Sequence, residues 1–138
     1  MSEIKVDKIS GKTSANAVTV TGENGSTQTS LQQGLAKAWI NFDGSGTIAS
    51  RDTFNTTSLT DEGTGNYSFD FVNDMANNDY AISGQNRSPG VRAGAGINAP
   101  SNSDSDAATG SLEFFTIFVT GDPFDYTQIS VIIHGDLA

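Results

Sequence analysis

The side chains best suited to polar binding gather between residues 85 and 98. Two of the chain's seven basic groups, Arg87 and Arg92, lie there. Arginine offers five N–H donors in a fixed fork, and amide side chains both donate and accept, so such groups suit sugar hydroxyls and acidic saccharides. The sequence therefore offers one candidate binding surface, made of Gln85, Asn86, Arg87, Arg92 and Asn98. The alternative is that the arginines serve a subunit contact or are simply solvated.

Catalytic chemistry has little support. His134 is the only histidine and the chain has no cysteine, so a nucleophilic triad or a histidine-based metal site would depend on one residue near the C-terminus. Carboxylates gather in turn-like stretches, notably Asp104 with Asp106 and Asp61 with Glu62. We interpret them as solvated turn acids, although three copies around an axis could still assemble a cation site. We expect no enzymatic activity, no catalytic residues, no metal site and no cofactor.

Charge and composition exclude several partners. The formal net charge is −9, with 16 acidic against 7 basic residues, which disfavours both nucleic acid and an anionic membrane surface. No run approaches the roughly 20 apolar residues that a membrane-spanning helix needs. The first five residues lack the apolar core of a signal peptide. We expect neither nucleic acid nor membrane as a partner.

Residues 38–138 show the alternation of a β-rich domain. Tyr67, Phe69 and Phe71 alternate with polar residues, which predicts a half-buried strand over 66–71. Further strands are predicted over 38–42, from 47 to a break at 61–65, from 80, over 111–120 and over 128–134. A long connection is predicted over 85–110, within which 91–93 and Ile97 could form a short pairing. We therefore predict an all-β fold, an antiparallel, jelly-roll-like β-sandwich of about six to seven strands. We interpret these aromatic residues, and Trp39, as core rather than as sugar-stacking rings.

Residues 1–37 contain too few large apolar side chains to bury a core of their own. The only helix signal is at 31–37, where Ser30 could cap the first turn. We predict an extended N-terminal arm over 1–37 for attachment and trimerisation, and a head domain over 38–138. The arm would be stabilised by two further copies, which would cover Ile4, Val6, Val18, Val20, Leu31 and Leu35. A disordered or loosely attached arm is the alternative.

Several short segments carry a family resemblance. They are AWINFDGSGT at 38–47, RDTFN at 51–55, SLTD at 58–61, GTGNY at 63–67, NDYA at 78–81 and ISVIIHGD at 129–136. As a set they resemble a module of tail fibres and other structural proteins of tailed bacteriophages, especially marine and cyanobacterial ones. The leader at 4–14, IKVDKISGKTS, is similar to fibre leaders.

The resemblance implies a homotrimeric virion appendage that carries a binding head and is made in the host cytoplasm. We therefore expect a short tail fibre or fibre-like protein whose head binds a host-surface receptor, a saccharide, and whose other partners are tail or capsid proteins. One alternative is a capsid or tail decoration protein that stabilises the virion without binding a receptor. Another is a stand-alone sugar-binding module.

Overall fold

The structure, a computed structural model, describes residues 3–12, 17–22, 25, 27–90, 97–98 and 107–138. The chain divides into two compact units, Met1–Leu35 and Ala36–Ala138. The second unit is called the head.

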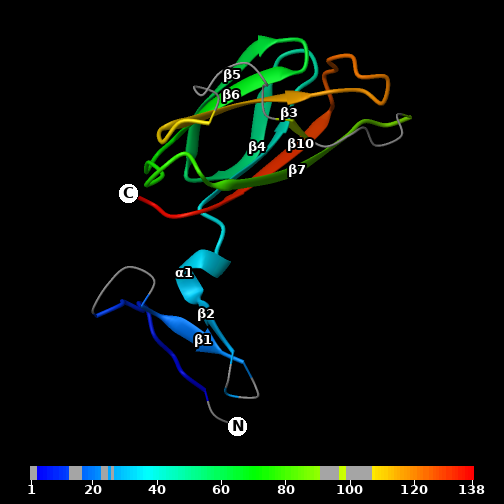
Figure 1. The fold of residues 1–138 in the computed structure, drawn as a ribbon. Coiled ribbons are helices and arrows are strands. Elements are labelled where there is room, and N and C mark those ends of the chain that lie inside the picture. Colours follow the sequence, from blue (N-terminus) through cyan, green and yellow to red (C-terminus); the bar gives the residue numbers. More distant parts are fainter. Residues whose placement is uncertain (1–2, 13–16, 23–24, 26, 91–96, 99–106) are drawn as a thin grey trace. The chain divides into compact units, whose positions relative to one another are not determined.

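The first unit holds a short hairpin followed by one helical turn (Figure 1). Strands β1 (Thr19–Thr21) and β2 (Gln28–Ser30) pair antiparallel, and α1 (Leu31–Gly34) follows directly. The hydroxyl of Ser30 accepts a hydrogen bond from the backbone N–H of Gln33 at 3.3 Å, as expected of an N-cap. The helix is a single turn within the segment 31–37 where helix was predicted, and it ends because Leu35 has extended backbone angles directly after Gly34, a weak helix former.

The apolar side chains of this unit are largely open to solvent. The exposed fraction is 86% for Ile4, 57% for Val6, 56% for Val20 and 55% for Leu35, while Val18 and Leu31 are partly buried. None of these side chains belongs to the buried core, which lies wholly in the head.

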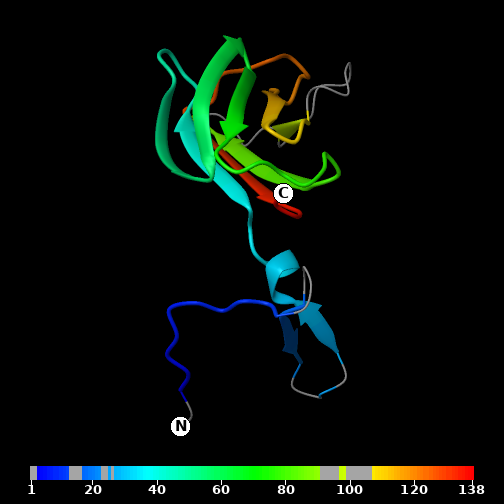
Figure 2. The same ribbon diagram turned by 90° about the vertical axis from the view of Figure 1, so that its left-hand side faces the viewer.

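The head is an antiparallel β-sandwich, which confirms the predicted fold class (Figures 1 and 2). Its described residues form eight strands rather than the expected six to seven. One sheet has the order β4-β3-β10-β7, and the other has the order β5-β6-β9-β8. Their strands are β3 (Ala38–Asp43), β4 (Ala49–Phe54), β5 (Thr56–Gly63), β6 (Asn66–Phe71), β7 (Ala81–Arg87), β8 (Ile97–Asn98), β9 (Ser111–Thr116) and β10 (Gln128–His134).

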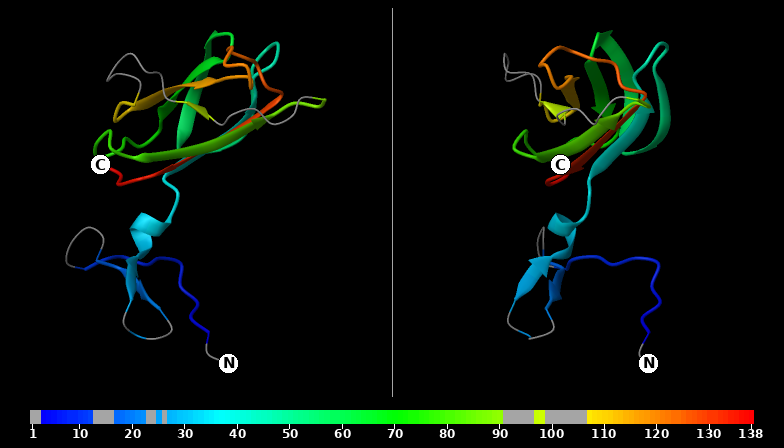
Figure 3. Two further views of the ribbon diagram at one scale, coloured as in Figure 1. Left: turned by 45° about the vertical axis from the view of Figure 1, so that its right-hand side comes forward. Right: turned by 90° about the vertical axis from the view of Figure 1, so that its right-hand side faces the viewer.

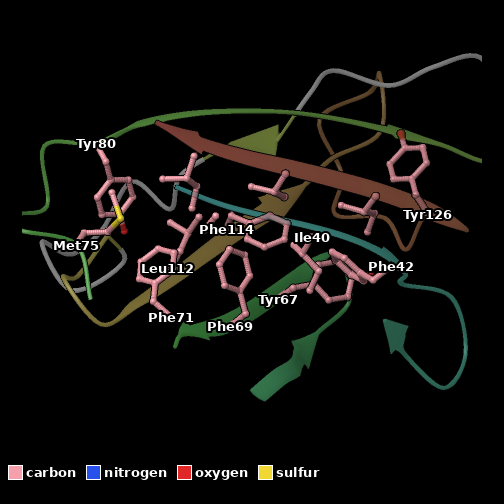
Figure 4. Close-up of a cluster of buried hydrophobic side chains, with 14 residues drawn as sticks. Ile40, Phe42, Tyr67, Phe69, Phe71, Met75, Tyr80, Leu112, Phe114 and Tyr126 are labelled. Atoms are coloured by element: carbon pink, nitrogen blue, oxygen red, sulfur yellow. The ribbon is translucent and has the colours of Figure 1, made fainter. Parts of the chain in front are cut away.

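The core lies between the two sheets and is rich in aromatic side chains (Figure 4). Tyr67, Phe69 and Phe71 of β6 are at most 5% exposed, so their predicted place in the core is confirmed. Phe42 of the facing sheet meets Tyr67 edge to face, with ring centroids 5.0 Å apart and planes at 72°. Edge-to-face pairs place the positive rim of one ring against the negative face of another, which adds to the stabilisation from burial.

The predicted single strand from 47 to the break at 61–65 was wrong, because the chain turns at Asn55 and enters the other sheet. Asn55 has φ of 56°, a left-handed conformation that asparagine tolerates better than most residues. Its side chain donates to the carbonyl of Lys37 at 3.0 Å and accepts from the backbone N–H of Asn73 at 2.8 Å. These bonds hold the corner between β4 and β5.

Two further boundaries differ from expectation. Strand β7 continues to Arg87, so the connection begins after residue 85, whereas the short pairing expected near Ile97 is β8, which pairs with β9. Strand β9 ends at Thr116 rather than at 120, because the N–H of Phe118 bonds to the carbonyl of Asp122 and closes a turn.

Candidate functional site

The outer face of the sheet β4-β3-β10-β7 presents side chains in ordered rows. On β3 the side chains of Ala38, Ile40 and Phe42 are buried, so the residues between them point outward. Strands β7 and β10 run side by side along this sheet (Figure 3). Their register places outward residues of all four strands opposite one another.

One row is apolar. Trp39 lies opposite Phe54 on β4 and opposite Ile132 on β10, and we call these three residues the apolar row. Phe54 is 52% exposed and Ile132 is 41% exposed, while Trp39 is partly buried. The interpretation of Trp39 as a core residue was therefore wrong. Its neighbours Ala38 and Ile40 take the inward positions, so the indole is left on the outer face.

The next row is polar. Asn41 lies opposite Asp52 on one side and Ser130 on the other, and Ser130 lies opposite Gln85. The amide nitrogen of Asn41 donates to Oγ of Ser130 at 2.6 Å. This polar row thus carries amide, hydroxyl and carboxylate groups directly beside the aromatic rings.

A hollow of about 370 Å³ opens near the ends of these strands and contains two guanidinium groups. Arg51, Arg87, Ser88, Pro89, Thr127 and Gln128 line it, and we call it the arginine hollow. A smaller hollow of about 170 Å³ shares Arg87 and Gln128 with it and reaches Gln85 and Ser130 of the polar row. The two hollows and the polar row are therefore one continuous surface.

A β-bulge brings Arg51 to this surface. The pairing of β3 with β4 shifts between Asn41 and Phe42, which leaves Arg51 as the extra residue of β4. Its Nη2 donates to Oδ2 of Asp43 at 2.9 Å, and its Nη1 donates to the carbonyl of Phe42 at 3.4 Å. These contacts hold the long side chain over the face.

Asp43 is itself held as a carboxylate. Its Oδ1 accepts bonds from the hydroxyl of Ser45 at 2.7 Å and from the backbone N–H of Ser45 at 3.0 Å. The Ser45 hydroxyl bond, the Ser45 backbone bond and the charge of Arg51 all lower the pKa of Asp43 below its usual range. Asp43 is therefore ionised at neutral pH and anchors Arg51.

Arg87 is positioned by contacts between the end of β7 and the start of β10. Its Nε donates to Oε1 of Gln128 at 2.7 Å. The N–H of Thr127 donates to Oγ of Ser88 at 2.9 Å, and the hydroxyl of Thr127 donates to the carbonyl of Arg87 at 3.2 Å. Hydrogen bonds from side chains and from the backbone thus stabilise the wall of the hollow.

The five residues expected to bind a receptor fall in different places. Gln85 and Arg87 lie on the outer face, whereas Asn86 points the other way and is only 4% exposed. Asn98 belongs to β8 in the other sheet, and Arg92 lies outside the described residues. The structure adds Arg51, which sequence reasoning missed because no local pattern shows that the end of β4 lies near the end of β7.

No three or more His, Cys, Asp or Glu side chains among the described residues converge as metal ligands would. Within the described ranges no helix has the length and apolar character to cross a membrane.

Comparison of the chain with protein-family models, with curated proteins and with solved structures finds no match. The class of the head is accordingly defined by its own fold, an antiparallel β-sandwich with one amphipathic sheet face.

Proposed function

We propose that this protein is a non-enzymatic structural protein of a phage virion, a short trimeric tail fibre or fibre-like appendage whose head binds a host-surface saccharide. The observation that supports saccharide binding is the outer face of β4-β3-β10-β7, where the apolar row, the polar row and the arginine hollow adjoin. The resemblance of residues 38–138 to phage fibre modules supports the virion location.

A sugar ring matches such a face. Its C–H groups pack on aromatic rings, and its hydroxyls need donors and acceptors at the ring edge. Trp39 and Phe54 supply adjacent aromatic surface, and Asn41 and Ser130 supply polar groups two residues further along the strands, on the same face. The rings and polar groups are held by sheet register, so little ordering would be needed on binding.

The first unit supports assembly into a trimer. Its apolar side chains are mostly exposed in a single copy, and surfaces of this kind are usually covered by a partner. Three copies would present three identical heads, so weak individual sites would gain avidity without new contacts.

The apolar row also favours the second candidate function, a capsid or tail decoration protein. Phe54 and Ile132 could pack on a neighbouring virion protein instead of on a sugar. In that case the same face would stabilise the particle and would have no saccharide specificity.

A glycan array probed with the intact chain distinguishes the two functions. We expect saccharide binding that falls several-fold to about tenfold in Phe54→Ala, since a lost aromatic contact costs about 0.5–1.5 kcal/mol. Val119→Ala is the matched control, because Val119 is 66% exposed and lies outside this face. Absence of glycan binding, together with binding of the intact chain to expanded empty capsids, would replace the adhesion proposal with decoration.

A further inference from the structure

We infer that the arginine hollow binds the anionic group of an acidic saccharide, either a uronate carboxylate or a sulfate ester. This inference rests on the proposed saccharide-binding function and names the ligand class of that site.

The distribution of positive charge is the first argument. The head sequence contains four basic residues, Lys37, Arg51, Arg87 and Arg92. Lys37 is buried, and Arg92 lies outside the described residues. The exposed cations of the described head are therefore Arg51 and Arg87, and both line the same hollow. In a chain of net charge −9 this hollow is a local exception that would attract an anion.

The hydrogen-bonding capacity of the two guanidinium groups is the second argument. The contacts of Arg51 with Asp43 and Phe42 use two of its five N–H groups, and the bond of Arg87 to Gln128 uses one. Asp43 partly neutralises Arg51, whereas no carboxylate of the described chain is in ion-pair contact with Arg87. Arg87 is therefore the principal anion-binding group, and Arg51 flanks it.

The surroundings of the hollow favour a saccharide over a small free anion. A volume of about 370 Å³ exceeds what a single ion fills, and Ser88, Thr127 and Gln128 add hydroxyl and amide groups to its wall. The hollow continues into the polar row through Gln128 and Arg87. When the charged sugar of an oligosaccharide lies in the hollow, the sugars next to it could thus lie along the polar and apolar rows. Nucleic acid is a poor fit, because its phosphate backbone would meet an acidic protein.

Two matched pairs of probes test this inference by titration calorimetry with the intact chain. One pair is oligogalacturonate and its methyl ester, and the other is a sulfated galactan oligosaccharide and its desulfated counterpart. We expect the acidic member of one pair to bind at least tenfold more tightly than its neutral partner, and the pair that responds distinguishes carboxylate from sulfate.

Four variants test which residues carry the preference. Arg87→Gln should abolish the preference for the acidic probe, and Arg51→Gln should reduce it by a smaller factor. Lys8→Gln removes the same charge from the first unit and should leave binding unchanged. Because Arg87→Gln also loses the contact with Gln128, thermal unfolding of each variant is compared with the parent, and Arg87→Lys, which keeps the charge, should retain part of the preference.

The contrary outcomes are distinct. Equal binding of acidic and neutral probes, unaffected by Arg87→Gln, overturns the inference and leaves saccharide binding intact. Equal losses in Arg87→Gln and Lys8→Gln overturn it too, because they indicate general electrostatics. Failure of all four probes to bind overturns it, and the glycan array then decides separately whether the head binds other saccharides.

Discussion

The phenolic oxygen of Tyr67 lies 2.8 Å from Oδ1 of Asp125, and this bond joins the centre of the core to the segment that leads into β10. The same carboxylate oxygen accepts the backbone N–H of Gly65 at 2.6 Å, and Tyr67 also contacts the carbonyl of Gly44 at 3.1 Å. Gly44 follows Asp43, and Asp125 lies two residues before Thr127. The buried tyrosine therefore supports the backbone from which both sides of the arginine hollow are built.

Replacing Tyr67 by Phe should lower the free energy of unfolding by about 1–3 kcal/mol, because it removes the one phenolic hydrogen that Oδ1 of Asp125 and the carbonyl of Gly44 share. Denaturant unfolding measures the change. Tyr126→Phe is the comparison, since its hydroxyl makes one bond, to the neutral carbonyl of Ile117 at 3.1 Å. A smaller loss in Tyr67→Phe than in Tyr126→Phe would contradict the supporting role of the Tyr67–Asp125 bond.

Two glycines with the same backbone conformation should respond differently to alanine. Gly65 and Gly46 have φ of 69° and 64°. A Cβ at Gly65 would lie 2.7 Å from the backbone nitrogen of Phe124, whereas one at Gly46 would meet nothing within 4 Å. Gly46→Ala should therefore lower the free energy of unfolding by about 1 kcal/mol, because alanine is strained in the left-handed conformation. Gly65→Ala should lower it by clearly more, because the added Cβ also meets the backbone. Thermal or denaturant unfolding measures the loss of stability in each variant. Equal losses of stability would show that the backbone near Gly65 shifts to accommodate the added methyl group.

Alkaline pH should destabilise the head through its tyrosines. Burial raises the pKa of Tyr80 from 10.0 to about 12, and burial likewise raises the pKa of Tyr67 and of Tyr126. Since the folded head retains protons that the unfolded chain releases, stability is complete below about pH 10 and falls as pH rises toward 12. The free energy of unfolding, measured from about pH 8 to about pH 11, should decline at the upper end, and Tyr80→Phe should flatten the decline. A profile that stays level above pH 10 would argue against these shifts.

The oligomeric state should depend on the first unit. Val20→Asp places a charge in the exposed apolar surface of β1, so we expect the proposed trimer to dissociate in native mass spectrometry. Val119→Asp makes the same change at a valine of the head that is 66% exposed, and it should leave the trimer intact. A monomeric parent chain, or a trimer that survives Val20→Asp, would remove the assembly proposal.

The strands with regular alternation were predictable. In β6 and β10 inward apolar residues alternate with other residues, and a period of two is a local property that needs no knowledge of the partner strand. The cap at Ser30 was likewise visible, because a capping side chain acts on the backbone three residues away.

Trp39 was misplaced because the run Ala38-Trp39-Ile40 is apolar at every position. The full strand, AWINFD, puts Trp39 on the same face as Asn41 and Asp43, so its alternation already indicates the outer face. Arg51 could not be placed from local alternation. Arg51 reaches the outer face through a bulge that exists only where β4 meets β3.

The sequence alone determined that the head is built from antiparallel strands, because alternation and turn residues act over a few neighbouring positions. Only the tertiary structure decided which strands share a sheet, that the chain changes sheets at Asn55, and that Arg51 and Arg87 line one hollow. Those features depend on hydrogen bonds and packing between segments far apart in the chain, and no short window of sequence records such pairings.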